Sequence, residues 1–387
     1  MKTTTHRKRV PRALRSGLRN YWYPVIDSSQ VGLERPVGVT RLGESLVVWR
    51  DGDGTAHVLV DRCAHRSARL SLGDVINGRL QCRYHGAQYD GSGQCRMVPI
   101  DVQEDGPIAR RVRVGSYPTE ERGGFIWAYL GDVEVFPPEP LSLEPEMEDP
   151  SYVWSIYESV WEANWLLVHD NTSDALHFPF LHGHFTAYRD GDTVQFGPAG
   201  AGNPAVTPEN ARETVLERFV PQRTEKGVFQ AVKHRKKAAD PRTVHELEFV
   251  LPCLVKVWVP FPDGGHPHRF LQYQYPIDEN RTIVYAWFGK QADNEEERAV
   301  AEYAVKKFGA SVAHQVFGED SWICASQGDV DYAREHESLF PTDAGVAAVR
   351  QRILDAFEDQ CRQSALETSD GDGDDMAAAA ASQGGSA

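Results

Sequence analysis

The chain has 387 residues, enough for two ordinary domains, and its 41% hydrophobic and 25% charged residues are typical of a folded protein with a buried core. Its 41 Lys and Arg stand against 56 Asp and Glu, and the net charge of −15 argues against nucleic acid as the main partner. No run of about 18 apolar residues is present, and the basic first residues lack an apolar segment. We therefore expect no membrane span, no secretory signal and a cytoplasmic location.

The two ends of the chain differ from its body in charge. Residues 1–19 carry seven Lys and Arg and no acid, whereas residues 364–387 carry five acids and no base. We predict a basic disordered tail over residues 1–19 and an acidic, Ala- and Gly-rich disordered tail over residues 366–387. Between them, the Pro-rich stretch after residue 135 indicates a linker, so we expect one domain over residues 20–135 and a second over residues 136–365.

The first of these domains has the pattern of short strands. Residues 37–63 hold two β-branched and aromatic runs joined by Asp-Gly-Asp-Gly, which is a hairpin signal. Further short strands are predicted at residues 88–89 and 124–129, separated by Gly-rich turns. The pattern predicts an all-β domain.

Two Cys-His pairs lie within this domain. Cys63 and His65 form one pair, Cys82 and His85 form the other, and sixteen residues separate the pairs. Two thiolates and two imidazoles are the donor set of a Rieske [2Fe-2S] cluster, in which Cys binds one iron and His the other. A structural Cys2His2 zinc site uses the same donors, but zinc fingers place the two Cys together and the two His together. Cys95 lies outside the ligand pattern, and we expect a buried, inert thiol there.

The residues around these pairs resemble the Rieske family. The segment from Cys-Ala-His-Arg to Leu-Gln-Cys-Arg-Tyr-His-Gly carries the resemblance, which extends over the whole predicted domain. One departure is Ala87, where members of the family commonly have Trp. The resemblance implies a [2Fe-2S] cluster held by Cys63, His65, Cys82 and His85.

The second domain is predicted to combine one sheet with helices. Residues 161–177 have a helical pattern, and residues 294–327 form a late helix with acids in its first turn. Between these helices, alternating runs indicate one extended antiparallel sheet. These runs cover residues 212–220, 228–235, 243–260, 267–276 and 281–289. We therefore predict an α+β fold in which an all-β domain precedes an antiparallel-sheet and helix domain of helix-grip-like form.

A cluster of carboxylates and imidazoles follows the first helix. Asp174 and His177 are three residues apart and share one face if the helix continues, while Pro179 breaks the helix and lets His182 return to the same point. Two His and one carboxylate form the facial triad of non-haem Fe(II) oxygenases. The distant carboxylate is either Glu319 or Asp320 in the late helix, and helical arithmetic leaves both open.

The pattern Asn-x-x-Asp-x-x-His-x4-His with the later Phe-x-Glu-Asp resembles the catalytic domain of Rieske non-haem iron oxygenase α-subunits, over residues 20–365. The resemblance implies that His177, His182 and Asp320 bind iron. It also implies that Asp174 bonds to an iron ligand and to a cluster histidine of a neighbouring subunit, and that Asn171 lies beside the iron. His169 and His184 lie nearby, but neither fits the spacing.

The expected function is therefore oxygenation. The enzyme would use O2 at a mononuclear Fe(II) to hydroxylate, demethylate or oxidatively cyclise an aromatic or polycyclic small molecule. Electrons would come ultimately from NAD(P)H through a ferredoxin or reductase, with a basic patch at Arg66, Arg69 and Arg83 as the docking surface. The family resemblance further implies a homotrimer and the homomeric branch, with a lean toward the chlorophyllide and pheophorbide oxygenases. An electron-transfer protein without oxygenase chemistry is the alternative.

Overall fold

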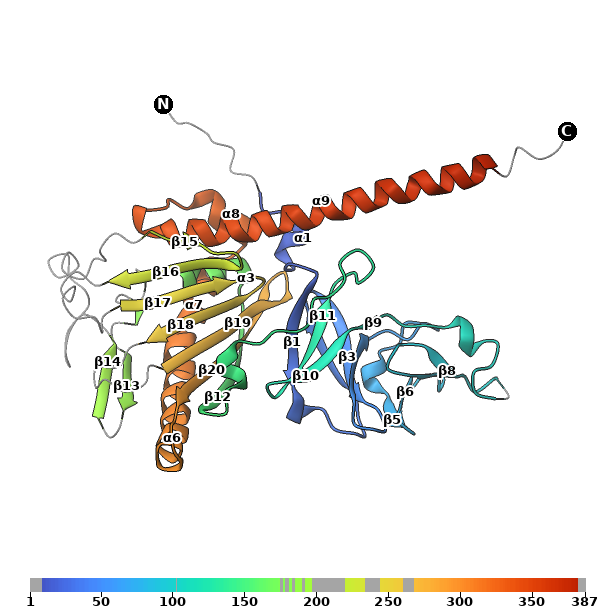
Figure 1. Ribbon diagram of the computed structural model, residues 1–387, viewed down its shortest axis with the longest axis horizontal. Coiled ribbons are helices and arrows are strands. Elements are labelled where there is room, and N and C mark those ends of the chain that lie inside the picture. The colour runs from blue at the N-terminus through green and yellow to red at the C-terminus, as the bar shows by residue number, and fades with distance from the viewer. Residues whose placement is uncertain are drawn as a thin grey trace.

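The first third of the chain folds into three small antiparallel sheets. In this computed structural model the sheets have the orders β1-β11-β10, β2-β3-β4-β9 and β5-β6-β7-β8 (Figure 1). Their strands are β1 Tyr21–Asp27, β2 Val37–Arg41, β3 Glu44–Arg50, β4 Ala56–Val60, β5 Asp74–Ile76, β6 Arg79–Gln81, β7 Gln88–Tyr89, β8 Cys95–Met97, β9 Ser116–Tyr117, β10 Thr119–Arg122 and β11 Phe125–Leu130. The structure describes residues 9–101, 103–174, 177, 181–182, 185–189, 192–196, 220–233, 244–259 and 268–381. The predicted all-β architecture is confirmed.

Strand β3 is the centre of this region. It pairs with β4 across the predicted Asp-Gly-Asp-Gly turn, where the Asp51 carboxylate accepts hydrogen bonds from the backbone of Asp53 and Thr55. Its side chains alternate between two cores: Leu46 and Val48 belong to one, and Val47 and Trp49 to the other. A strand buried on both faces is apolar throughout, which explains its continuous hydrophobic run.

One seven-stranded antiparallel sheet organises the rest of the chain. Its order is β12-β20-β19-β18-β17-β16-β15, so neighbouring strands are mostly consecutive in sequence. The strands are β12 Tyr152–Trp161, β15 Gln222–Arg223, β16 Gly227–Lys233, β17 Val244–Val250, β18 Leu254–Val259, β19 His268–Asp278 and β20 Arg281–Gln291. A separate hairpin is formed by β13 Phe185–Arg189 and β14 Asp192–Phe196. The predicted extended sheet is confirmed, and residues 212–219 of the first predicted run lie outside the described part of the chain.

The two faces of the large sheet have different partners, as β19 shows. Tyr273 and Tyr275 pack against the first third of the chain, in a core that also holds Tyr23 and Trp127. Phe270, on the opposite face, packs against the late helices. A shared aromatic core of this kind holds the cluster-bearing region and the large sheet in one orientation. The domain limits predicted from the sequence stay a prediction.

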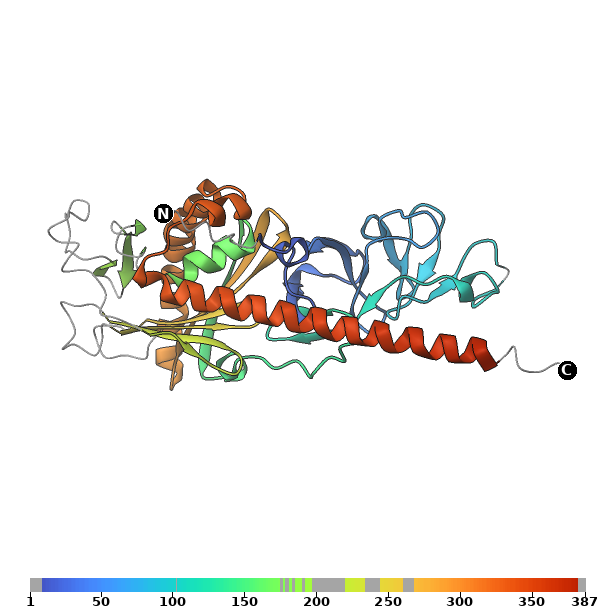
Figure 2. The same cartoon turned by 90° about the horizontal axis from the view of Figure 1, so that it is seen from above.

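The helices lie on the face of the sheet that Phe270 occupies, and they extend beyond it (Figures 1 and 2). They are α3 Trp165–Ser173, α6 Glu295–Ser311, α7 Phe317–Ser326, α8 Val330–His336 and α9 Ala344–Ala381. The short α2 Pro145–Glu148 lies on the opposite face, where Met147 packs against the core that holds Tyr273. The predicted late helix is interrupted by one π-helical segment, Val312–Val316, between α6 and α7. No helix in the described ranges combines the length and the hydropathy that crossing a bilayer requires.

The prediction of a disordered basic tail is wrong for residues 9–19. These residues contain helix α1 Arg12–Arg15, and Val10, Leu14 and Leu18 are buried against α3 and α9. These three apolar side chains are four residues apart in sequence and pack against an apolar surface. The positive charge of the segment gave no indication of this packing. Arg15 also pairs with Asp331 of α8. Residues 1–8 lie outside the described part.

The prediction for the acidic tail also differs from the structure. Helix α9 continues from Ala344 to Ala381, so the backbone is helical from residue 366, where we predicted disorder, to residue 381. The alanine run at residues 377–381 has the highest intrinsic helix propensity, whereas the Asp and Gly residues before it have low propensity. Residues 382–387 lie outside the described part.

Candidate functional site

Two matching loops carry the predicted cluster ligands. One follows β4 and the other joins β6 to β7. In each loop the cysteine carbonyl accepts a hydrogen bond from the residue four positions later, Ser67 at 2.8 Å from Cys63 and Gly86 at 2.9 Å from Cys82. Both of these residues have positive φ, 55° for Ser67 and 74° for Gly86. The loops thus make the same tight turn, and each turn brings its cysteine and its histidine to one end of the domain.

In this site the two cysteines lie deeper in the protein than the two histidines. Cys63 and Cys82 are buried at 3% and 1% exposure, whereas His65 and His85 are exposed. The two imidazole rings lie with their centroids 4.7 Å apart. An electron acceptor held here would be shielded on its cysteine side and open to a partner on its histidine side.

The distances between ligand atoms favour a [2Fe-2S] cluster over a single zinc ion. Ligand atoms of one tetrahedral zinc lie about 3.3–3.8 Å apart, so any three of them would form a compact group. Within the described residues, the one group with three ligand atoms inside 4.8 Å of one another is His177, His182 and Asp320. The two Cys-His pairs form no such group. A two-iron cluster needs no such group, because Cys63 and Cys82 would bind one iron and His65 and His85 the other.

Tyr89 contacts the cysteine side of this site. Its hydroxyl lies 3.2 Å from Cys63 Sγ, and both side chains are buried. Burial, and then the neighbouring Cys63 sulfur, raise the pKa of Tyr89, so the hydroxyl keeps its proton and can donate a hydrogen bond to a cluster-bound sulfur. Ala87, the departure from the family pattern, is buried beside these residues and fills the same core as Tyr89.

The Tyr89→Phe substitution is expected to lower the reduction potential of the cluster by about 50 mV. The hydrogen bond stabilises the more negative, reduced cluster more than the oxidised one, and about 1 kcal/mol corresponds to this shift for one electron. A spectroscopic redox titration measures it, with Tyr84→Phe as the control because Tyr84 is 57% exposed. Equal potentials in wild type and Tyr89→Phe would show that the contact does not tune the cluster.

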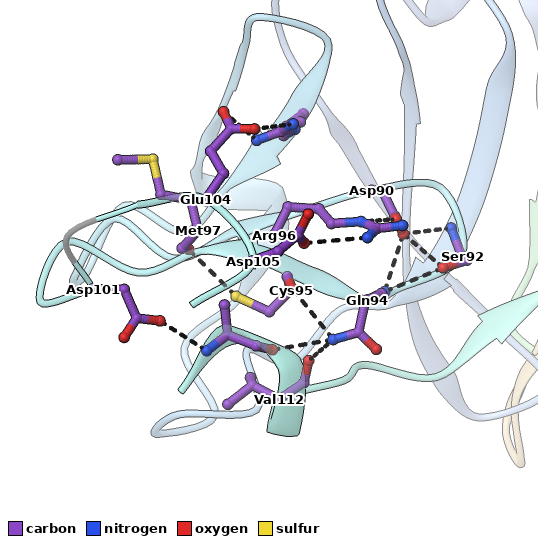
Figure 3. Close-up of polar contacts among 12 residues, drawn as sticks. Asp90, Ser92, Gln94, Cys95, Arg96, Met97, Asp101, Glu104, Asp105 and Val112 are labelled. Atoms are coloured by element: carbon purple, nitrogen blue, oxygen red, sulfur yellow. Dashed lines mark hydrogen bonds and ion pairs between the residues drawn. The ribbon is translucent and has the colours of Figure 1, made fainter. Parts of the chain in front are cut away.

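Cys95 has the structural role that we expected. It is fully buried, its Sγ donates to the Met97 carbonyl at 3.3 Å, and burial raises the pKa of its thiol. Figure 3 shows the polar network around it, in which Arg96 lies between Asp90 and Asp105. These contacts hold the segment next to the cluster loops and leave Cys95 as a packed thiol.

The second site begins where helix α3 ends. Asn164 caps the start of the helix by accepting a hydrogen bond from the Leu166 N–H at 3.1 Å. The helix ends at Ser173, and Asp174 has extended backbone, so the prediction that a helix carries both Asp174 and His177 is wrong. The Asp174 carboxylate instead accepts a hydrogen bond from the His177 N–H at 3.2 Å. The Asp174 side chain therefore holds the backbone N–H of His177 directly after α3.

Three side chains from distant parts of the chain converge beyond the end of α3. Asp320 Oδ1, from α7, lies 3.6 Å from His177 Nε2 and 3.1 Å from His182 Nε2. His182 is fully buried, and Asp320 is buried at 6% exposure. The imidazole rings are nearly perpendicular, with their centroids 5.3 Å apart. The structure thus brings together the three residues that the family resemblance identified as ligands.

The remaining nitrogen of each ring is held by an oxygen acceptor. His177 Nδ1 lies 2.6 Å from the Asp174 carbonyl, and His182 Nδ1 lies 2.7 Å from Glu319 Oε2. A proton on each Nδ1 leaves both Nε2 atoms directed at the shared centre with a free electron pair. Metal-binding histidines show this arrangement, because the outer acceptor fixes the ring and increases its basicity. The donor set of two imidazoles and one carboxylate therefore fits Fe(II).

Asp320 is also oriented from outside the group of three. Asn171 Nδ2, on α3, donates to Asp320 Oδ1 at 3.0 Å. Burial lowers the pKa of His182, but hydrogen bonds and charges from Asp320 and then Glu319 outweigh it, and the pKa of His182 is raised. Both carboxylates thus favour positive charge at the shared centre, which a divalent cation supplies.

The structure shows which of Glu319 and Asp320 faces the metal group, and it shows a separate contact for the other residue. Asp320 faces the two Nε2 atoms, while Glu319 contacts the outer Nδ1 of His182 and is 39% exposed. The sequence did not indicate the contact between Glu319 and the outer nitrogen of His182. The π-helical segment Val312–Val316 adds a residue to the turn just before α7, so α-helical arithmetic cannot place the side chains of this stretch.

His169, the nearby rival, points away from the site. Its Nε2 lies 2.8 Å from the Gln274 carbonyl, and its ring packs edge-on against Trp165 and Phe249. His184, the second rival, lies outside the described residues. His169 is a buried core residue enclosed by aromatic rings, which agrees with its misfit to the ligand spacing.

His169 is expected to lower the free energy of unfolding as the pH becomes acidic. Burial lowers its pKa to about 4, whereas the pKa in the unfolded chain is about 6.5. Its contribution is complete above pH 6.5 and is lost as the pH falls toward the folded value, because the unfolded state takes up the proton first. The free energy of unfolding should fall by about 2 kcal/mol between pH 7 and pH 5 from this residue alone. Urea unfolding of wild type and His169→Phe at both pH values measures it: equal losses in the two proteins would contradict this assignment.

A cavity of about 500 Å³ opens beside the group of three. Four elements meet there: α3, α7, the loop after α8 and the start of α9. Its polar wall contains Asp170, Asn171, Asp174, His177, Asp343 and Arg350. Asp174 is therefore placed where a second molecule can reach it.

Two family models match the chain and divide it as the fold does. The Rieske [2Fe-2S] domain matches residues 21–118, and the vanillate O-demethylase oxygenase C-terminal domain matches residues 161–359. The first match contains both Cys-His pairs, and the second contains His177, His182 and Asp320.

Among curated proteins, the chain is similar to the 5,5'-dehydrodivanillate O-demethylase oxygenase subunit of Sphingobium sp. SYK-6, with 32% identity over 88% of this chain and 76% of the relative. Chlorophyllide a oxygenase of Chlamydomonas reinhardtii is 35% identical over 44% of this chain and 25% of the relative. Among solved structures, NdmA of Pseudomonas putida with caffeine has a TM-score of 0.68 at 26% identity, over 90% of this chain and 96% of that one. The match to the chlorophyllide oxygenase is partial, so the lean toward that group stays a prediction.

Proposed function

The chain belongs to the Rieske non-haem iron oxygenases, and from that premise we propose that it removes a methyl group from a methoxylated aromatic compound. It is an oxidoreductase that uses a Rieske cluster, a mononuclear iron, O2 and electrons from a partner. The alternative of a pure electron carrier is set aside, because more than half of the chain matches an oxygenase domain.

One observation carries the proposal of O-demethylation. The catalytic half matches the C-terminal domain of vanillate O-demethylase over residues 161–359, and a relative similar along the whole chain is also named as an O-demethylase. Within the described residues, the helix that carries Asp320 packs against aromatic side chains of the sheet, including Phe270 and Phe288. Apolar surroundings with a few polar groups suit an aryl methyl ether.

The site residues have the following proposed roles. Cys63 and Cys82 hold one iron of the cluster, and His65 and His85 hold the other. His177, His182 and Asp320 hold the mononuclear iron, which when bound supplies the activation of O2. Asn171 orients Asp320 through its amide, and Glu319 orients His182. Burial of His182 and Asp320 excludes water from one side of the centre.

The overall reaction balances in atoms and electrons. One aryl methyl ether, one O2, two electrons and two protons give one phenol, one formaldehyde and one water. A Rieske cluster delivers one electron at a time, so two electron transfers accompany each turnover. The exposed histidine side of the cluster is the surface from which the chain can pass these electrons on.

We propose that electrons pass between subunits of a homotrimer. The sheet β5-β6-β7-β8, which carries the Cys82 loop, lies at one end of the molecule, and α3 and α7 lie in its other half (Figures 1 and 2). A second copy can present His65 and His85 to the cavity that contains Asp174. The acidic side chain of Asp174 in that cavity suits the positive charge of the cluster end.

A ferredoxin is the proposed electron donor. Arg66, Arg69 and Arg83 are exposed beside the cluster histidines, as the predicted docking patch requires. Because the chain carries a net charge of −15, an acidic ferredoxin would need a local basic patch such as this one. The cytoplasmic location expected from the sequence stays a prediction.

The proposal is tested by formaldehyde release from a panel of methoxylated aromatics. The purified enzyme, with about three irons per chain, is supplied with O2 and a reducing ferredoxin system. We expect one formaldehyde and one phenol per O2 consumed with at least one compound of the panel. Coupled O2 consumption with methylxanthines or unsubstituted rings, and none with methoxylated compounds, would contradict O-demethylation while leaving the oxygenase assignment in place.

A further inference from the structure

A partly buried ion-pair network connects the C-terminal helices to the end of α3. We name it the α3 clamp, and it consists of Asp170, Arg334, Glu337 and Arg350. Arg350 Nε and Nη2 donate to the two oxygens of Asp170 at 2.8 and 2.7 Å. The same guanidinium donates to both oxygens of Glu337 at 2.7 and 2.8 Å. Arg334 Nη2 reaches Asp170 at 3.3 Å.

The clamp is too buried to be an ordinary surface ion pair. The side-chain exposures are 12% for Asp170 and 17% for Arg350, and four hydrogen bonds fix the guanidinium in one orientation. Burial lowers the pKa of Arg350, but Asp170 and Glu337 outweigh it, and the pKa is raised. Planar, two-pronged pairing of this kind gives geometric precision that Lys does not provide.

The position of Asp170 points to a use beyond stability. It lies in the last turn of α3, where the helix dipole disfavours an acid. Asn171 follows it directly and donates to Asp320, and the Asp174 N–H bonds back to the Asn171 carbonyl at 3.1 Å. Asp170 and Arg350 also line the cavity that contains Asp174 and His177. The clamp thus holds the turn from which the metal group is oriented.

We propose that Arg350 is a positioning residue for the mononuclear iron site. Its hold on Asp170 places Asn171 against Asp320 and Asp174 against His177, although Arg350 contacts none of the three ligands in the described contacts. The inference rests on the proposed function for the identity of the metal. It assigns a task to a residue of α9, about 170 positions after the His motif in sequence.

The test is the affinity of the mononuclear site for Fe(II), measured on the full chain after a chelator has removed this iron while the cluster stays bound. Removal of residues that orient metal ligands weakens metal binding about 10- to 100-fold. We expect a loss of at least about tenfold in Arg350→Gln and Asp170→Asn, a smaller loss in Arg350→Lys, and an unchanged visible spectrum of the cluster.

Two controls separate positioning from stability. Val349→Ala removes buried apolar groups from the same helix, and Arg223→Gln removes the ion pair between Arg223 and Asp355, which ties α9 to the sheet away from the site. Both should bind Fe(II) as wild type does, whatever their melting temperatures. An Arg350→Gln protein that binds Fe(II) as tightly as Val349→Ala would overturn the proposal.

A second variant keeps the test decisive if Arg350→Gln does not fold. Asp170→Asn preserves the shape of the side chain and removes its charge, and wild-type Fe(II) affinity in that variant would equally overturn the proposal. Because the measurement needs no substrate, failure of the O-demethylation assay leaves it unaffected.

Discussion

Replacement of His177 by Ala is expected to abolish product formation and to remove one iron from each chain, while the visible spectrum of the cluster stays unchanged. His177 supplies one of three donor atoms that converge within 4.8 Å. With two donors left, the site no longer retains its metal, and the loss of several kcal/mol of catalytic stabilisation corresponds to at least about 10³-fold in turnover. Iron analysis and a formaldehyde assay measure the two effects.

His314→Ala provides the matched control for this prediction. His314 is exposed on the π-helical segment before α7, so its removal changes the histidine content of the same region without changing the metal group. We expect wild-type iron content and turnover in that variant. Persistent turnover in His177→Ala would show that the iron is held elsewhere.

The Asp174→Asn substitution is expected to slow oxidation of the cluster in a single turnover by about 100-fold while about three irons per chain remain. Asn keeps the oxygen that accepts the His177 N–H bond, so the turn after α3 is retained. It lacks the charge that would bind a cluster histidine of the neighbouring subunit in the cavity. Rapid mixing of the reduced protein with O2 and substrate, followed by absorption of the cluster, gives this rate.

The control for Asp174→Asn is Asp343→Asn. Asp343 lines the same cavity, and its substitution removes the same charge without altering a residue next to a metal ligand. A rate close to that of wild type is expected there. Rapid oxidation of the cluster in Asp174→Asn would count against a bridging role and against transfer through this cavity.

Much of the fold could be predicted because local pattern and tertiary structure agree. The hairpin across Asp51 to Gly54 and the alternating strands of the large sheet follow from turn chemistry and a period of two. The helix predicted over residues 161–177 extends four residues beyond α3 at each end, and at its C-terminal end this is because the spacing of Asp174 and His177 also fits a helical face. The hydrogen bond from the His177 N–H to the Asp174 carboxylate, which follows α3, is seen only in the structure.

The N-terminal segment shows the opposite case. Its charge indicated a solvated tail, yet Leu14 and Leu18 are buried against α3 and α9, which lie more than 140 residues later in the sequence. Composition averages over a segment and cannot reveal that a few apolar side chains meet a complementary surface. Burial of those side chains is enough to order the segment.

The sequence by itself determined the chemistry of both metal sites, because short spacings identify donor types: two Cys-His pairs, and two His that share one region with an Asp. Only the tertiary structure decided which carboxylate faces the metal group: Asp320 lies against the Nε2 atoms, and Glu319 contacts the outer nitrogen of His182. It also decided that Arg350 meets Asp170. Contacts between residues far apart in sequence depend on how the elements pack, and no local pattern encodes them.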